Sequence, residues 1–399
     1  MNQETKTIDH SQRAHALLSA SGASRWLNCT PSARLEELQG PRESSAYAEE
    51  GTLAHELSEL FVRKDVLHNI SDAEFESQLG HIMGNELFDE EMIGYADDYA
   101  TYCAAQFAEA KERTRLSQLQ VEQRIDLREY VPESFGTVDC CILSDGTLEV
   151  IDFKYGKGVP VYAEWNPQLM LYGLGALIKY DTLFDINKVL LTIIQPRIDN
   201  INSFEISVED LLKWAEEELK PKAQKAFAGE GELEPGGWCR FCAVRNRCRA
   251  LYEQQIEIAK HDFKKPELLT DEEIADIVLR SSSFVEWVNG INDYAREQAV
   301  SNNKTWPGLK LVEGVSRRKL ADHDMVAEAI LAQCPDVAEE ELFDMKLKSI
   351  TQVEKSLGKK RFQEVCADLI IKPQGKPTLV SADDKRPALG IEDAINDFK

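Results

Sequence analysis

The feature that most constrains the fold of this chain is a β-hairpin expected within residues 135–154. Two strand-like runs, Phe135 to Leu143 and Thr147 to Lys154, follow one another closely. They are joined by Ser144-Asp145-Gly146, whose Asp-Gly pair favours a tight turn. The chain is therefore expected to place two antiparallel strands side by side here.

Two aspartates and a lysine are expected to meet on one side of this hairpin. Asp139 and Asp152 are distant from the turn by similar lengths, so strand pairing brings their carboxylates together. Side chains alternate along a strand, so Lys154 shares a face with Asp152, and Phe153 points into the core. Such a patch suits a divalent cation and an activated water. An isolated Asp-x-Lys is more often a salt bridge at a sheet edge, so the neighbouring residues must decide.

Two neighbouring segments favour the metal-site interpretation. Gln168 and Tyr172 are four residues apart on a helix that opens at Asn166-Pro167, so they share a face that can turn towards the hairpin. His55 lies on an earlier helix, in Gly51-Thr52-Leu53-Ala54-His55, where it can act as a metal ligand. A lone histidine is more often structural, and Glu50 beside this segment is more often a solvated helix glutamate than a part of the site.

The order of the expected elements indicates a mixed α/β core. Apolar residues three and four apart predict helices, and continuous or alternating apolar runs predict strands. In chain order, the elements are helices 48–64 and 90–113, strands 119–127, 135–143 and 147–154, a helix 166–179, a strand 188–194 and a helix 208–228.

Four short motifs occur in the order found in RecB-type nucleases of the PD-(D/E)XK class, and the chain resembles that class. The motifs are G-x-x-x-H ending at His55, G-x-x-D ending at Asp139, D-x-K from Asp152 to Lys154, and Q-x-x-x-Y from Gln168 to Tyr172. The resemblance covers roughly residues 15–255. It implies a restriction-endonuclease-like core of helix, three strands, helix and strand. The sequence beyond this core is expected to form a mainly α-helical C-terminal extension. It also implies metal-dependent deoxyribonuclease activity, that of an exonuclease that hydrolyses phosphodiester bonds.

The same resemblance implies a role for each motif residue. His55, Asp139 and Asp152 would hold Mg²⁺ or Mn²⁺, helped by the carbonyl of Phe153. Lys154 would orient or help deprotonate the attacking water and stabilise charge on the phosphate. The remaining two catalytic-site residues, Gln168 and Tyr172, would position the active-site strand and the DNA backbone.

A cysteine triplet, Cys239-x2-Cys242-x5-Cys248, predicts a second metal site. Three cysteines do not complete a tetrahedral site, and Cys29, upstream of the whole core, is the best fourth candidate. The arrangement resembles that of iron-sulfur nucleases: the CRISPR-associated adaptation exonucleases, the nuclease subunit of AddAB, and the eukaryotic replication nuclease-helicase. The resemblance implies a 4Fe-4S cluster that joins the two ends of the nuclease domain. Zinc and unligated thiols stay open as alternatives. The other cysteines lie in apolar surroundings that indicate core packing.

Charge is the main argument against nucleic-acid binding. The 399 residues carry a formal net charge of −24, whereas DNA affinity normally depends on cations that neutralise phosphates. One acid-free segment, residues 236–250, offers a local DNA-binding patch of Arg240, Arg245, Arg247 and Arg249. The charge also keeps two other hypotheses open: a non-catalytic DNA-end-binding protein, and an acidic protein-interaction factor.

The remaining expectations concern organisation and setting. We expect a nuclease domain over 1–258, a mainly helical domain over 259–371 that begins with a helix capped by Thr270 and Glu273, and a flexible tail over 372–399. No signal peptide or membrane-spanning window occurs, so a cytoplasmic protein without a membrane partner is expected. The whole chain also resembles an uncharacterised family encoded by phages and prophages. That resemblance implies work in DNA recombination or processing in the host cell, beside a single-strand-binding or annealing protein.

Overall fold

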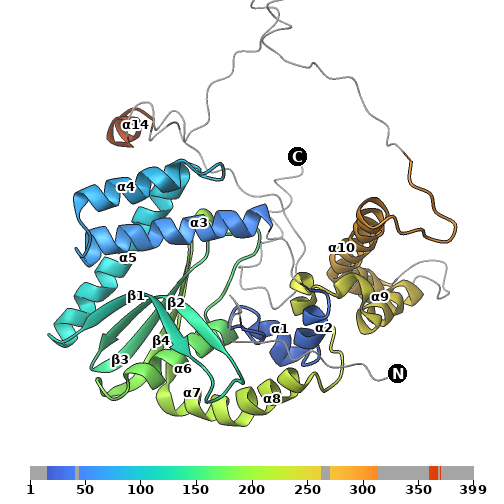
Figure 1. Ribbon diagram of the computed structural model, residues 1–399, viewed down its shortest axis with the longest axis horizontal. Coiled ribbons are helices and arrows are strands. Elements are labelled where there is room, and N and C mark those ends of the chain that lie inside the picture. The colour runs from blue at the N-terminus through green and yellow to red at the C-terminus, as the bar shows by residue number, and fades with distance from the viewer. Residues whose placement is uncertain (1–15, 41–44, 262–269, 313–358, 367–368, 370–399) are drawn as a thin grey trace, which may run out of the picture. The chain divides into compact units, whose positions relative to one another are not determined.

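The computed structural model describes residues 16–40, 45–261, 270–312, 359–366 and 369 (Figure 1). The chain divides into two compact units, Met1–Lys264 and Lys265–Lys399. The tail expected over 372–399 lies outside the described residues. Among the residues that are described, no helix is long and apolar enough to cross a membrane.

A five-stranded mixed sheet forms the centre of the first unit. Its strands lie in the order β1-β2-β3-β4-β5. The pairs β1–β2, β2–β3 and β4–β5 are antiparallel, and β3 and β4 are parallel. Parallel neighbours need a crossover connection, and α6 supplies it. The bounds are β1 Gln118–Asp126, β2 Phe135–Ser144, β3 Gly146–Phe153, α6 Pro167–Tyr180, β4 Ile186–Gln195 and β5 Asn200–Ser207.

The expected hairpin is confirmed. Ser144 pairs with Thr147 across the Asp145-Gly146 turn, and pairing continues to Cys140 opposite Ile151. Gly146 has a φ of 81°, in the left-handed region that glycine adopts without a steric penalty. The hairpin ladder therefore ends just before the two aspartates. The fifth strand, β5, was not expected; its burial alternates along an exposed edge, which leaves a weak hydrophobic signal.

Helices cover both faces of the sheet (Figure 1). One face packs against α3, α4 and α5 around Ile151, Phe153 and Tyr99. The opposite face packs against α1, α6, α7 and α8 around Leu148, Val150 and Leu191. The bounds are α1 Ala23–Asn28, α2 Ser32–Glu37, α3 Ala46–Phe61, α4 Asp72–Met83, α5 Glu91–Arg113, α7 Val208–Trp214, α8 Lys220–Ala228 and α9 Arg249–His261.

Capping side chains determine where the helices that carry site residues begin. The Ser45 hydroxyl accepts a hydrogen bond from the backbone of Ala48 at the start of α3. The Asn166 side chain accepts from the backbone N–H groups of Gln168 and Leu169, with Pro167 in the first turn, as the sequence predicted. These caps set the helical register of the histidine on α3 and of the glutamine and tyrosine on α6.

The described part of the second unit is mainly helical. Its long helix α10, Asp271–Ser301, begins with the expected capping box, in which the side chains of Thr270 and Glu273 each accept from the other's backbone N–H. A short helix, α14, spans Lys359–Cys366.

Candidate active site

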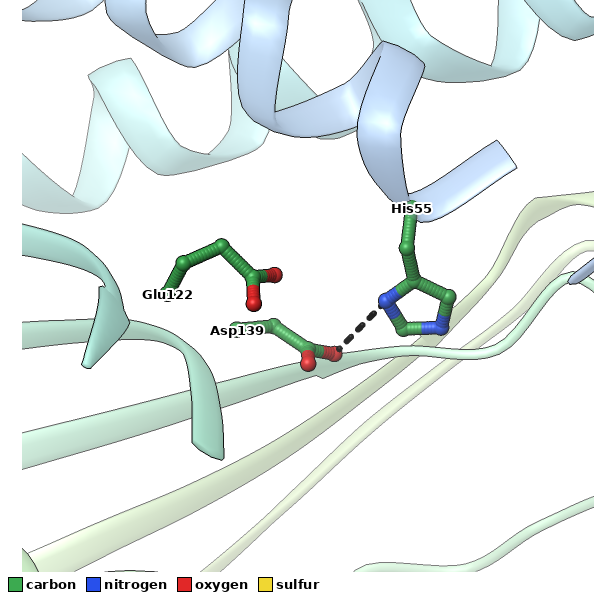
Figure 2. A group of neighbouring side chains, drawn as sticks. All are labelled: His55, Glu122 and Asp139. Atoms are coloured by element: carbon green, nitrogen blue, oxygen red, sulfur yellow. Dashed lines mark ion pairs between the residues drawn. The ribbon is translucent and has the colours of Figure 1, made fainter. Parts of the chain in front are cut away.

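The structure brings the expected motif residues together at the end of the hairpin ladder. His55 comes from α3, Asp139 from β2, Asp152 from β3 and Gln168 and Tyr172 from α6. His55 Nδ1 lies 3.4 Å from Asp139 Oδ2 (Figure 2). The His55 ring also packs edge-on against Phe153, at 5.4 Å between centroids, which fixes its orientation above the sheet.

Hydrogen bonds tie these side chains into one network. The Phe153 backbone N–H donates to Asp139 Oδ2 at 2.8 Å. Lys154 Nζ lies 2.8 Å from Asp152 Oδ2 and donates to Gln168 Oε1 at 3.1 Å. The Gln168 amide donates to Asp152 Oδ1 at 3.3 Å and to the hydroxyl of Tyr172 at 3.1 Å. Gln168 therefore holds the carboxylate, the lysine and the tyrosine in one arrangement.

Glu122 is a member of the site that sequence reasoning missed. The donor atoms of His55, Glu122 and Asp139 all lie within 4.8 Å of one another (Figure 2). The flanking pairs Val121–Cys140 and Gln123–Val138 place Glu122 opposite Asp139. Its φ is 48°, a left-handed conformation that a non-glycine residue seldom adopts, and such strain concentrates at functional sites. Only the register of β1 on β2 could have revealed it.

The charges of this site perturb one another. Burial opposes ionisation of Asp139, but His55, Lys154 and the Phe153 N–H outweigh it and lower the pKa of Asp139. Burial would lower the pKa of His55, but the Asp139 carboxylate reverses the effect and raises it. Partial burial, then the charge of Asp139, raises the pKa of Glu122 to about 7, although part of that side chain is exposed. The pKa of Glu122 therefore lies near neutral pH, as is common for groups in functional sites.

Asp152 and Lys154 form a buried pair beside that group. Burial raises the pKa of Asp152 to about 6, an effect that the Lys154 charge opposes. Burial opposes the charge on Lys154, but Asp152 and Asp139 outweigh it and raise the pKa of Lys154. Lys154 is therefore kept as a cation, which suits charge stabilisation better than proton abstraction.

The donor set fits a divalent cation, with one difference from the expected ligands. One imidazole and carboxylate oxygens are ligands that Mn²⁺ accepts readily, and Mg²⁺ binds carboxylates. Asp152 is not a member of the group within 4.8 Å, because Lys154 and Gln168 engage its oxygens. Glu122 belongs to that group instead. Asp152 lies close enough to the group for the charges of Asp139 and His55 to affect its pKa.

An arginine at the rim was also missed. Arg197 Nη1 lies 3.1 Å from Glu50 Oε1, and its guanidinium stacks on the Tyr155 ring at 4.4 Å from the centroid. Glu50 is thus paired, whereas the sequence favoured a solvated side chain. The pair joins α3 to the turn that follows β4.

The four expected cysteines line one small cavity. Cys29 follows α1, and Cys239, Cys242 and Cys248 come from the turns after α8. Burial raises the pKa of Cys29, and the charges of Cys239 and Cys248 raise it further, which reflects their closeness. Burial also raises the pKa of Cys242 to about 11. The thiols of Cys29 and Cys242 therefore stay protonated near neutral pH unless a metal displaces their protons.

The segments that carry these cysteines are held together by direct bonds. Glu36 Oε1 accepts from the Ala243 backbone at 2.6 Å, although the two residues are 207 positions apart. Thr30 donates to the Glu230 carbonyl at 2.5 Å, and Arg34 donates to the Phe227 carbonyl at 2.6 Å. The cysteine cavity therefore lies where the N-terminal helices of the unit meet its last turns.

The remaining cysteines are mostly core residues. Cys103, Cys140 and Cys141 are fully buried, which confirms the expected packing role. Cys366 is only half-buried, and Cys334 lies outside the described residues.

The arginines beside the cysteines do not form one surface patch. Arg240, Arg247 and Arg249 are exposed. Arg245 is half-buried, lines the cysteine cavity and donates to the Arg240 carbonyl at 2.9 Å. Its charge lowers the pKa of Cys239, an effect that burial outweighs. Arg245 therefore faces the thiols, and only the other three are presented to solvent.

These features occur in a mixed α/β protein with a five-stranded sheet flanked by helices. Residues 15–387 match the family described as "Protein of unknown function (DUF2800)", and the chain belongs to that family. The chain is also similar to a solved structure described as "Crystal structure of SSO0001", at 16% sequence identity, over 55% of this chain and 95% of that chain. The TM-score of that match is 0.24.

Proposed function

We propose that this protein is a metal-dependent deoxyribonuclease of the PD-(D/E)XK type, acting on DNA ends. One observation carries the proposal: the histidine, carboxylates, lysine, glutamine and tyrosine of four separate motifs meet at the end of one hairpin. A structural salt bridge between Asp152 and Lys154 would need none of the other four side chains.

In this proposal His55, Asp139 and Asp152 hold Mg²⁺ or Mn²⁺, and Glu122 joins them. The bound cation would supply charge stabilisation and an activated water for phosphodiester hydrolysis. A water oxygen bonds to phosphorus while the bond from phosphorus to the ester oxygen breaks. Lys154, held as a cation between Asp152 and Gln168, stabilises the negative charge that develops on the phosphate. Tyr172 and Gln168 keep the lysine and the carboxylate in place.

The second part of the proposal is a 4Fe-4S cluster on Cys29, Cys239, Cys242 and Cys248. The four cysteines line one small cavity, where the N-terminal helices meet the last turns of the unit. This placement agrees with the cluster that the resemblance to iron-sulfur nucleases implies, and zinc on the same four thiolates is the alternative.

The setting of the activity is proposed from the resemblance alone. We place the protein in the cytoplasm of a bacterial host, encoded by a phage or prophage, in DNA recombination or processing. A single-strand-binding or annealing protein would be its partner on DNA.

The decisive experiment is degradation of end-labelled single- and double-stranded DNA with Mg²⁺, with Mn²⁺ and with chelator. We expect metal-dependent cleavage by the wild type and none by Asp139→Asn. Asp145→Asn is the matched control, because this exposed residue lies in the turn at the other end of the same hairpin, where Asn-Gly is equally suited. Metal-independent cleavage, or full activity of Asp139→Asn, would refute the assigned site. DNA binding without cleavage would favour the non-catalytic end-binding hypothesis.

Iron content tests the cluster separately. The anaerobically purified wild type is expected to be brown and to contain iron, and Cys29→Ser should lose iron as completely as Cys242→Ser. Cys103→Ser, which changes a fully buried thiol away from the cavity, should keep it. Near-normal iron in Cys29→Ser would show that the fourth ligand is wrong, and zinc in the wild type would overturn the cluster.

A further inference from the structure

The segment between β3 and α6, two elements that carry active-site residues, presents three exposed side chains with large apolar surfaces. Val159, Tyr162 and Trp165 are 38%, 44% and 56% exposed. The segment begins at Lys154 and ends at the helix that carries Gln168, and these two residues are hydrogen-bonded to each other in the active site. The segment is therefore tied to the active site at both of its ends.

Amide side chains of β4 and β5 hold this segment in place. Gln195, itself 1% exposed, accepts from the Val161 backbone at 3.1 Å and donates to the Val159 carbonyl at 2.9 Å. Asn200 donates to the Val161 carbonyl at 2.9 Å, and Asn202 accepts from the Ala163 backbone at 2.6 Å. The exposed apolar side chains are thus presented by an anchored backbone rather than by a free loop.

Trp165 is held in a strained conformation with its ring supported from one side. Its φ is 50°, in the left-handed region where a bulky residue is an outlier. The indole packs against the Phe204 ring at 5.4 Å between centroids, at an angle of 46°. The Trp165 side chain is thus held partly in solvent by a strained backbone. Backbone strain of this kind is concentrated at functional sites.

The charge of the protein bears on what can occupy this surface. A chain with a net charge of −24 gains little from general attraction of phosphates. Between Lys154 and the start of α6, the sequence contains one cationic residue, Lys157, and one acidic residue, Glu164. Aromatic rings can instead stack on bases, which contributes to affinity regardless of sequence. Base faces are accessible in unpaired strands and covered in a duplex.

We propose that Tyr162 and Trp165 form a stacking platform for the unpaired bases of single-stranded DNA that enters the active site. This inference rests on the proposed nuclease function and names its substrate class. The platform supplies affinity through base faces, and the metal and Lys154 engage the phosphate.

Binding can be tested apart from cleavage by fluorescence anisotropy with the full chain in metal-free buffer. The probes are a labelled oligothymidylate and an abasic oligonucleotide of equal length, which keeps the phosphates and lacks the bases. We expect the wild type to prefer the oligothymidylate by about 5- to 150-fold, the range for stacking of one base. Trp165→Ala should lose most of this preference without a change in affinity for the abasic probe. Trp165→Phe, which keeps a ring, should retain most of it.

Leu183→Ala is the matched control, because this 67% exposed apolar residue follows the other end of α6; it should change neither affinity. Equal wild-type affinity for the two probes would overturn the platform, as would equal weakening of both probes by Trp165→Ala. Tighter binding of oligouridylate than of oligothymidylate would assign the surface to RNA and also overturn it. Cleavage without a base preference would leave the proposed nuclease standing and remove only the platform. A base preference without cleavage would support the platform and refute the proposed nuclease.

Discussion

The pH dependence of stability should reveal the buried carboxyl group of Glu149. This residue lies on β3, three positions before Asp152, and is 1% exposed. Its Oε1 accepts from the Thr192 hydroxyl at 3.5 Å, whereas its Oε2 has no hydrogen-bond partner. Burial, opposed by the charge of Arg113, raises its pKa from 4.5 to about 7.

The magnitude follows from that rise. A higher pKa in the folded state means that folding favours the protonated form, so the contribution is fully present below about pH 4.5 and is lost as the pH rises through about 7. At 1.36 kcal/mol per pH unit, the whole effect is about 3 kcal/mol. About 2 kcal/mol of it falls between pH 5.5 and pH 8. Glu149→Gln cannot ionise and should lack this loss.

Urea unfolding at pH 5.5 and pH 8 measures the effect, and both values lie above the isoelectric point near 4.8. Between the two, the wild type should lose about 2 kcal/mol more unfolding free energy than Glu149→Gln, because all other groups titrate alike in both proteins. Glu86→Gln, at an exposed site, should behave as the wild type. An identical pH dependence of wild type and Glu149→Gln would refute the account of a buried, under-paired carboxyl group.

Three further predictions concern catalysis, DNA binding and packing. Asp152→Ala and Lys154→Ala should both fold and lose nuclease activity, and calorimetric titration with Mn²⁺ should show binding largely retained only in the lysine variant. The exposed arginines are Arg240, Arg247 and Arg249. Neutralising them should lower the slope of log affinity against log salt by roughly 0.7 to 0.9 per lost phosphate contact. An unchanged slope would place the DNA elsewhere. Gly175→Ala should cost about 1 to 3 kcal/mol by overpacking, since a Cβ there would lie 2.6 Å from Ile125 Cδ1, and an unchanged urea midpoint would contradict that contact.

Local sequence determined the elements on which the site is built. The Asp145-Gly146 turn, the Asn166-Pro167 cap and the Thr270 capping box depend on residues within a few positions, and each is found where the sequence placed it. The spacing of Gln168 and Tyr172 on one helical face is equally local. Such features are set by backbone geometry and short-range hydrogen bonds, which a sequence reveals directly.

Only the tertiary structure decided the membership of the site and the neighbours of its charges. Glu122 joins His55 and Asp139 because one strand pairs in a particular register and takes a left-handed φ. Arg245 turns towards the thiols rather than to solvent. Both outcomes depend on packing between segments far apart in the chain, as does the meeting of Cys29 with the cysteine triplet. Residue spacing constrains local geometry strongly and long-range pairing weakly, because many registers and side-chain orientations satisfy the same hydrophobic pattern.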